Sequence, residues 1–257
     1  MNMSMRKKLY LFLASAVIIH FLFIYAKSSP FTVTRPVAVP TDVIVSTENT
    51  PHFDKVVSSS LALYDTLNLE QLGLSRRAYE YAIKGFNYLL STGKLNNDHV
   101  ISIVDFSKAS ANKRLFVIDL NDKKVLFNTY VSHGRNSGRE MAKEFSNAPE
   151  SFKSSLGFYV TGGTYIGKHG FSMRLFGEEK GINDNANSRA IVMHSAAYVS
   201  ESAIRMQGFI GRSLGCPALP EDIYKPIIQK IKNGSCLFIY SPNASYAAHS
   251  TILKKVA

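Results

Sequence analysis

Short β-type runs separated by turn residues dominate the sequence from Val100 onward, and they constrain the fold more than any other feature. Val, Ile, Phe and Tyr favour strands, whereas Asn, Asp, Lys and Gly occupy the intervals, as at Asn121-Asp122. The six runs are VISIVDF, RLFVIDL, KVLFNTYV, LGFYV, RAIVM and CLFIY. Because short strands bury their apolar faces by pairing and stacking, we expect a mainly β domain, sandwich-like or barrel-like, over residues 96–245.

A helical pattern precedes the strands. Ser75 is placed to cap a helix whose apolar residues recur at helical spacing, and Gly93 lies just past its end. A further helix is expected from about Tyr224 to Lys232. We therefore predict an α+β protein overall, in which a small N-terminal helical portion, residues 51–95, packs on the β domain and residues 246–257 form a C-terminal tail.

The N-terminus has the layout of an export signal. Arg6, Lys7 and Lys8 precede residues 9–26 (LYLFLASAVIIHFLFIYA), which carry no Asp, Glu, Lys or Arg. This stretch is long for a signal peptide and close to the minimum for a membrane span, so residues 1–26 are either a signal peptide or a membrane anchor. The following segment, 27–50, is rich in Pro, Ser, Thr and Val and is expected to be an extended linker. The protein is predicted to lie in the periplasm or cell envelope, anchored by residues 9–26 if they are retained.

The charge balance favours an anionic partner outside the cytoplasm. The chain has 30 Lys and Arg against 19 Asp and Glu, a formal net charge of +11. No long Lys/Arg run and no zinc-finger spacing is present, so nucleic acid is not an expected partner. For an exported protein, the cell wall or the membrane surface is the better candidate.

The two cysteines have different settings. Cys216 lies in a Gly-flanked turn (SLGCP), whereas Cys236 lies in an apolar run (SCLFIY) that predicts a buried strand. A disulfide between them is the alternative, because cysteines of exported proteins are often paired. The difference in setting favours a free, reactive Cys216.

His194 precedes Cys216 by 22 residues and ends a β-type run. A strand end and a turn can bring the two side chains together, and an imidazole that accepts the thiol proton converts cysteine into a usable nucleophile. This pair predicts acyl transfer through a thioester. The backbone N–H groups that stabilise the oxyanion should come from Leu214, Gly215 and Cys216, because Pro217 has none.

On these residues the sequence resembles the YkuD-like L,D-transpeptidases, whose signature is a His followed, after an intervening segment, by Ser-His-Gly-Cys. His194 and the segment Ser213-Leu214-Gly215-Cys216 match it, and the resemblance extends over residues 74–240. It implies that Cys216 is the nucleophile, that His194 is the base, and that Ser213 and Gly215 shape the catalytic turn. It also implies peptidoglycan stem peptides as substrates, without a cofactor.

The sequence departs from the family signature at three positions. Ser195 follows the His where Gly is usual, Leu214 replaces the motif His, and Ala218 stands where Arg is common. The substrate-binding charge must then come from elsewhere. Arg212 is the first candidate, with Arg174 and Arg189 behind it. Tyr165 and the GKHGF segment at residues 167–171 resemble the family's substrate-covering region, and Tyr165 and Ser195 complete the expected substrate-binding set.

Several alternatives remain open from the residues alone. Water in place of an amine acceptor would give an L,D-carboxypeptidase, and the lost motif residues are compatible with a wall-binding pseudoenzyme. Papain-like peptidases have the reverse Cys–His order, and sortases carry their cysteine after a Thr-rich strand. A zinc set of His133, His169 and His194 is disfavoured because no short ligand pair is present.

Overall fold

The computed structural model describes residues 62–256. The predicted signal peptide or anchor at 1–26, the linker at 27–50 and the start of the helical portion lie outside these residues. Within the part of the chain that is described, no helix is both long and apolar enough to cross a membrane.

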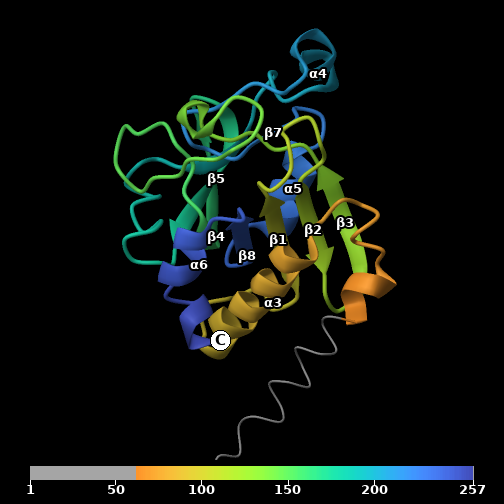
Figure 1. The fold of residues 1–257 in the computed structure, drawn as a ribbon, viewed down its shortest axis with the longest axis vertical. Coiled ribbons are helices and arrows are strands. Elements are labelled where there is room, and N and C mark those ends of the chain that lie inside the picture. Colours follow the sequence, from red (N-terminus) through yellow and green to blue (C-terminus); the bar gives the residue numbers. More distant parts are fainter. Residues whose placement is uncertain (1–61, 257) are drawn as a thin grey trace, which may run out of the picture. The chain divides into compact units, whose positions relative to one another are not determined.

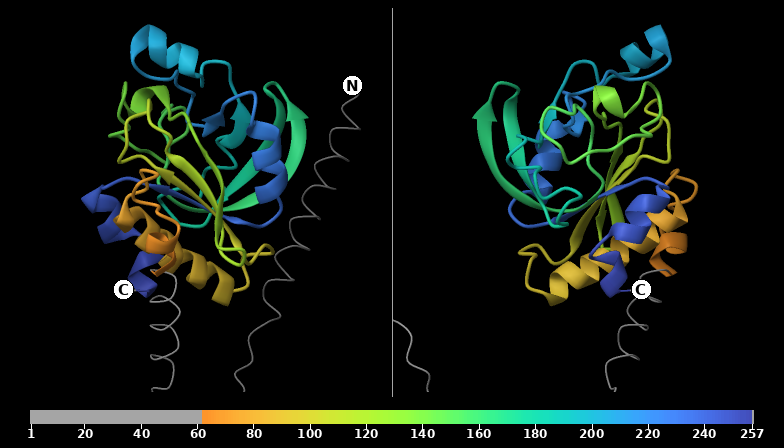
Figure 2. Two further views of the ribbon diagram at one scale, coloured as in Figure 1. Left: turned by 90° about the vertical axis from the view of Figure 1, so that its right-hand side faces the viewer. Right: turned by 60° about the vertical axis from the view of Figure 1, so that its left-hand side comes forward.

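One curved sheet of eight strands forms the centre of the domain (Figures 1 and 2), which confirms the predicted mainly β class. Its order is β3-β2-β1-β8-β4-β5-β6-β7. The β1–β8 and β6–β7 pairs are parallel, and the other neighbours are antiparallel. The strands are β1 (Val100–Asp105), β2 (Leu115–Asp119), β3 (Lys124–Thr129), β4 (Gly157–Gly167), β5 (Gly170–Gly177), β6 (Val192–Ser195), β7 (Ala218–Leu219) and β8 (Cys236–Tyr240).

The middle of the sheet is covered on both faces. Every residue of β1, β2 and β8 is buried, which explains why these strands are apolar runs with little alternation. Phe158 of β4 stacks on Phe238 of β8, with ring centroids 4.2 Å apart. The core is therefore centred on these strands and extends to Met193 of β6 and Leu219 of β7, where His194 and Ser195 are the polar residues.

Two helices were correctly expected from the sequence. Helix α3 (Arg76–Ser91) begins after Ser75, whose side chain accepts a hydrogen bond from the Ala78 N–H, and it packs on β1 and β8. Helix α5 (Tyr224–Ile231) packs on β1, β5 and β6, on the opposite face (Figure 2). The shorter helices are α4 (Glu201–Gln207), α6 (Ala244–His249), η1 (Arg135–Ser137) and η2 (Leu253–Lys255).

The segment expected to form a C-terminal tail is packed into the domain instead. Its attachment point is the buried carboxylate of Glu179, which accepts hydrogen bonds from the Phe158 N–H, the Tyr246 hydroxyl and the Ser250 hydroxyl. Ile252 also lies in the apolar core. A buried carboxylate requires such donors, and here the C-terminal residues supply two of them.

Two strands, β5 and β7, were not expected from the sequence. The fourth apolar run ends at Val160, and Gly162-Gly163 resembles a turn, yet β4 continues through a register shift between Thr161 and Thr164 and pairs with β5. A Cβ at Gly162 would lie 2.6 Å from the Phe176 ring, so the hairpin needs glycine at this position. Strand β7 is only two residues long, and a strand this short has no periodic pattern in the sequence.

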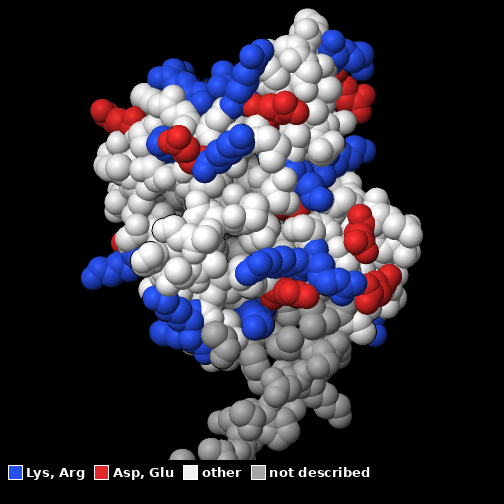
Figure 3. Space-filling model, in the orientation of Figure 1, with Lys and Arg blue, Asp and Glu red and all other residues white. Residues whose placement is uncertain are grey.

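Lys and Arg side chains are scattered over the face shown in Figure 3, with Asp and Glu side chains between them. The positive charge is therefore not gathered into a single stripe on that face.

Candidate active site

The β6–β7 pair brings the two predicted reactive residues into one place. His194 of β6 is opposite Ala218 of β7, and Cys216 precedes Ala218 by two residues. Both side chains line one cavity of about 480 Å³. Both cysteines are free, and Cys236 is buried in β8, so the alternative of a Cys216–Cys236 disulfide is not what the structure contains.

His194 is 2% exposed and its tautomer is set by the main chain. Its Nδ1 lies 2.8 Å from the Ser195 carbonyl oxygen, which cannot donate, so Nδ1 carries the proton and Nε2 is left as an acceptor. Burial, with a smaller contribution from the neighbouring His169, lowers the pKa of His194. The two rings are stacked with centroids 4.3 Å apart. His194 is therefore a neutral imidazole at neutral pH, which is the form a general base requires.

The Cys216 side chain is partly exposed in the cavity. The Val192 N–H donates to Sγ at 3.5 Å, and the thiol is directed to the Ala190 carbonyl oxygen at 3.7 Å. Burial raises the pKa of Cys216, while the Val192 N–H and the Arg189 guanidinium act in the opposite direction. The resting thiol is thus protonated and needs a base to become a thiolate.

The turn that carries Cys216 depends on glycine. Gly215 has φ = 126°, and a Cβ there would lie 2.9 Å from the Lys153 carbonyl oxygen. Ser213 Oγ accepts the Gly215 N–H at 3.0 Å and donates to the Cys216 carbonyl at 2.6 Å. Since the Gly215 N–H is already bonded, the expected oxyanion set is reduced to Leu214 and Cys216, whose N–H groups donate no hydrogen bond among the described residues.

Residues 132–135, which we call the support segment, run beside this turn. The Ser213 N–H donates to the His133 carbonyl at 3.0 Å, and the Arg135 N–H donates to the Ser213 carbonyl at 2.8 Å. Ser132 also contacts β7: its N–H donates to the Ala218 carbonyl at 2.9 Å, and the Ala218 N–H donates to Ser132 Oγ at 3.1 Å. The Ser-His-Gly sequence of this segment, which resembles part of the family signature, thus holds the turn that carries Cys216 in register.

A buried pair, Arg114 and His133, holds the support segment in place through hydrogen bonds. Arg114 donates to the Val131 carbonyl at 3.1 and 2.9 Å and to the Lys108 carbonyl at 3.0 Å, and its Nη2 lies 2.8 Å from His133 Nδ1. His133 Nε2 lies 3.2 Å from the Gly138 carbonyl, so Nε2 donates and Nδ1 accepts. Burial, followed by the Arg114 charge, lowers the pKa of His133 to about 3. Burial lowers the pKa of Arg114 to about 9.

The predicted substrate-binding arginines differ in placement. Arg212 lines the cavity, but its Nη1 donates to the Arg135 and Gly138 carbonyls, both at 3.1 Å. The Arg174 guanidinium lies 4.8 Å above the centre of the Tyr165 ring, and Tyr165 lines the cavity. Arg174 therefore reaches the site through Tyr165. Ser195 contributes through its main-chain carbonyl, which orients His194.

Arg189 also lines the cavity, and its hydrogen bonds fix the neighbouring loop at residues 146–155. Nη1 donates to the Ser146 carbonyl at 2.7 Å and to Ser155 Oγ at 2.6 Å. Nη2 donates to the Lys153 carbonyl at 2.7 Å and to Ser151 Oγ at 3.0 Å. Four hydrogen bonds make Arg189 a structural clamp whose charge still acts on the Cys216 thiol.

Several cavity residues were not assigned to the site from the sequence. Tyr198 has its pKa raised by burial and follows β6 by three residues, in a turn that no periodic pattern marks. His169 was considered as a metal ligand and, within the GKHGF segment, as part of the substrate-covering loop; in the structure its ring stacks on that of His194. Lys168 of the same segment also lines the cavity, and the other lining residues without a predicted role are Ser172, Ala190, Ile191 and Val192.

Comparison with known families matches residues 70–240 to the model described as L,D-transpeptidase catalytic domain. Comparison with curated proteins gives no match.

Three of the solved structures that this chain is similar to share little sequence with it. An L,D-transpeptidase from Mycobacterium smegmatis is 14% identical, with a TM-score of 0.35, over 56% of this chain and 59% of that chain. The helical cell shape determining protein Pgp2 from Campylobacter jejuni is 15% identical, with a TM-score of 0.40, over 63% and 57%. An L,D-transpeptidase from Stackebrandtia nassauensis is 12% identical, with a TM-score of 0.34, over 74% and 80%. The chain thus spans under two thirds of the first two of these structures.

Proposed function

This chain belongs to the L,D-transpeptidase catalytic-domain family, and we propose that it is a peptidoglycan-modifying enzyme in which Cys216 forms a thioester with a wall stem peptide. One observation carries the proposal. The Cys216 thiol and the unprotonated Nε2 of His194 belong to the same cavity, and a main-chain carbonyl holds the imidazole in the tautomer that can accept the thiol proton.

The first half of the reaction forms the acyl-enzyme. His194 Nε2 accepts the Cys216 proton, and Sγ attacks a peptide carbonyl of the stem. The oxyanion is stabilised by the N–H groups of Leu214 and Cys216, and one such donor contributes about 3 kcal/mol. When the intermediate collapses, the C–N bond breaks, and His194 returns the proton to the departing amine of the terminal D-residue.

The second half transfers the acyl group. An amine on another stem attacks the thioester, His194 accepts its proton, and the Cys216 thiol is regenerated when that proton returns to sulfur. Water in place of the amine gives L,D-carboxypeptidase activity with the same residues in the same roles. Analysis of products from purified disaccharide-peptides separates the two, since only transfer joins two stems.

The resting state suits this sequence of proton transfers. Burial favours the neutral forms of both Cys216 and His194, so the pair stores no separated charge before substrate binds. Arg189 then favours the thiolate once the proton has moved. Export to the periplasm or cell envelope, by a signal peptide or an anchor at residues 1–26, would place the site beside its substrate.

Intact-protein mass spectrometry of the full chain incubated with disaccharide-tetrapeptides tests the proposal. We expect a mass increase equal to the mass of the substrate minus that of the free terminal D-amino acid it releases, absent in Cys216→Ala. An adduct that persists without the thiol, or no adduct and no product with the parent chain, would reject the proposed function.

A carbapenem offers a second probe of the same thiol. Its strained lactam carbonyl presents the electrophile that the activated sulfur attacks, and ring opening leaves a stable covalent adduct. We expect a drug-sized mass increase on Cys216 and no increase in Cys216→Ala. The same increase in both proteins would show that another residue reacts.

A further inference from the structure

His169 lies at the tip of the β4–β5 hairpin. The tip is the two-residue turn Lys168-His169, which is closed by the pairing of Gly167 with Gly170. A Cβ at Gly167 would lie 2.6 Å from the Tyr165 ring, so this ring packs closely against the base of the turn. The hairpin therefore holds His169 at a defined place on the wall of the thiol cavity.

The imidazole of His169 stacks on the imidazole of His194. The ring centroids are 4.3 Å apart, and the ring planes are inclined by 20°. His169 is exposed, and within residues 62–256 it forms no hydrogen bond or ion pair, so the stack is what ties it to the site. Because the two rings face each other, their in-plane nitrogen atoms are not directed at one another, and no proton passes directly between them. The contact is therefore one of packing between ring faces.

The main chain holds the His194 ring by one edge only. Nδ1 lies 2.8 Å from the Ser195 carbonyl oxygen. Rotation of a histidine ring about its Cβ–Cγ bond is broadly permitted, so one hydrogen bond at one edge leaves the ring plane free to tilt. A second ring stacked on the face restricts that tilt. The Ser195 carbonyl and the His169 ring together therefore define the direction of Nε2, the nitrogen that accepts the thiol proton in the proposed reaction.

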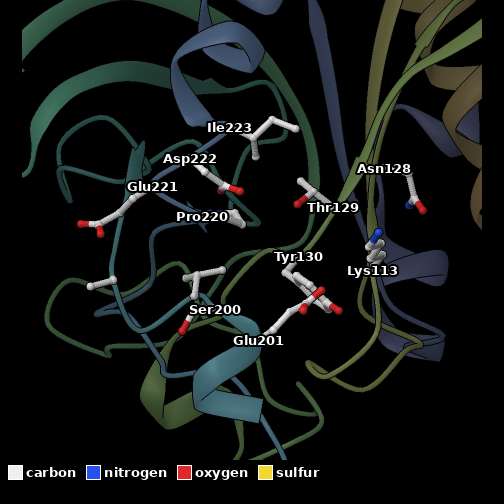
Figure 4. A pocket seen from close by; sticks show the side chains of 12 residues that line it. Lys113, Asn128, Thr129, Tyr130, Ser200, Glu201, Pro220, Glu221, Asp222 and Ile223 are labelled. Atoms are coloured by element: carbon white, nitrogen blue, oxygen red, sulfur yellow. The ribbon is translucent and has the colours of Figure 1, made fainter. Parts of the chain in front are cut away.

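No carboxylate is placed to orient His194. In nucleophile–base pairs a third group commonly orients the base. Among the described residues that line the thiol cavity, none is Asp or Glu. The acidic residues that follow β6 and β7 in the sequence, Glu201, Glu221 and Asp222, line a different cavity of about 510 Å³ (Figure 4). The orientation of His194 therefore depends on its own neighbouring carbonyl and on the ring that covers its face.

The remaining charged and titratable groups around His194 do not substitute for His169. They comprise cations and groups that are neutral at neutral pH, and the cations disfavour a protonated imidazole. Burial, and after it His169, lowers the pKa of His194. The stack thus also helps to keep the resting base neutral. The cations that line the cavity are Lys168, Arg189 and Arg212, with Arg174 behind Tyr165, and the neutral groups are Tyr165, Tyr198 and Cys216.

We propose that His169 is a positioning residue for the Cys216–His194 pair, whose stacked ring fixes the plane of the His194 imidazole and so the direction in which Nε2 accepts the thiol proton. The inference rests on the proposed function, because it gives His169 a part in the same proton transfer. His169 acts through His194 and needs no nitrogen of its own. An aromatic ring without nitrogen should therefore replace it, whereas a small side chain should not.

Alkylation of Cys216 by iodoacetamide in the full chain tests the inference. This small reagent reports on the thiol and its base without the contacts that a peptide substrate makes. His169→Ala should lower the plateau rate constant about fivefold to twentyfold, which is less than loss of the base itself. His169→Phe, which keeps a stacked ring, should stay within about twofold of the parent chain.

His249→Ala is the matched control. His249 is also an exposed histidine whose Nδ1 lies 2.8 Å from a main-chain carbonyl oxygen, that of Ser245, and it does not line the thiol cavity. Its loss should leave the alkylation rate unchanged. A His169→Phe plateau as low as that of His169→Ala would overturn the inference, because the nitrogen atoms and not the ring face would then matter.

The pH dependence of alkylation supplies a second readout. Loss of the His169 ring exposes one face of His194 to water and removes the neighbouring imidazole, and both changes raise the pKa of His194. The acid limb of the His169→Ala profile should therefore move to higher pH, and that of His169→Phe should move less. An unmoved limb in His169→Ala would overturn the inference.

Comparison with acylation by disaccharide-tetrapeptides separates positioning from contact with the substrate. Slower acylation of His169→Ala together with an unchanged alkylation plateau would overturn the inference, since His169 would then act on the substrate alone. A parent chain that gives the expected alkylation profiles but forms no acyl-enzyme would reject the proposed function and leave the positioning of His194 standing.

Discussion

A cysteine, a histidine and an arginine occur in each of two regions of the molecule. One region is the cavity that Cys216 and His194 line, and the other is the buried interior. The cavity set is Cys216, His194 and Arg189, and the interior set is Cys236, His133 and Arg114. Composition does not separate the two sets, because each has a thiol, an imidazole and a guanidinium. They differ in which polar atoms already have partners.

The two histidines show the difference most clearly. Both are nearly inaccessible, His133 at 0% and His194 at 2% exposed. His133 uses both ring nitrogens, one toward Arg114 and one toward the Gly138 carbonyl. His194 uses only Nδ1, and its Nε2 remains available in the cavity. Burial therefore does not distinguish the two imidazoles, and the ring nitrogen without a partner is what makes His194 the proposed base.

Substituting each cysteine separately should give the largest contrast between loss of activity and loss of stability. Cys216→Ala should abolish acyl-enzyme and product while the free energy of unfolding stays nearly constant, since the side chain is partly exposed. Cys236→Ser places a hydroxyl in the core and should cost about 1–3 kcal/mol of stability, with activity per folded molecule retained. Mass spectrometry and urea unfolding measure the two effects. Equal loss of activity in both variants, with both still folded, would show that Cys216 is not functionally different from Cys236.

Substituting each histidine separately should give the next largest difference between an effect on activity and an effect on stability. His194→Ala should slow Cys216 acylation by a factor on the order of a hundred or more, as for loss of a general base. His133→Ala leaves Arg114 and the Gly138 carbonyl without their partner and should destabilise the fold by about 2–4 kcal/mol. Single-turnover kinetics and urea unfolding distinguish the two. An unchanged alkylation rate and pH profile in His194→Ala would show that His194 and Cys216 are not a pair.

Acid should destabilise the protein through His133. Its pKa is about 3 in the folded state, below its ordinary value of 6.5, so the unfolded state takes up the proton first. The stabilisation is fully present above pH 6.5 and is lost as the pH falls from 6.5 toward 3, with a total of about 5 kcal/mol. His133→Gln should flatten this part of the stability profile. Parallel profiles for both proteins would exclude His133 as the cause.

The arginines should give the smallest functional effect. Arg189 lowers the pKa of Cys216, so Arg189→Met should move the thiol alkylation profile to higher pH and slow alkylation at neutral pH about threefold to tenfold. Arg189→Lys should restore part of the rate, because the charge returns without the planar fork. Arg114→Lys should instead lower stability by about 1–3 kcal/mol and leave the alkylation profile in place. A profile that does not move in Arg189→Met would mean that its charge does not reach the thiol.

Local patterns predicted much of the fold. The apolar runs correctly predicted β1, β2, β3 and β8, and Ser75 correctly marked the start of α3. Strand β5 was missed because its burial depends on the hairpin with β4, and β7 because two residues carry no period. The packed C-terminus was missed because the donors to Glu179 come from residues 67 and 71 positions away.

For the site, the sequence determined the reactive residue types and their order, since a turn with Gly215 and a strand end at His194 are local features. The tertiary structure alone decided which polar atoms are free. The His194 tautomer, the bonded Gly215 N–H and the clamp made by Arg189 all depend on the positions of surrounding groups in the folded chain. A buried polar group is defined by its partners, and most of those partners are distant in sequence.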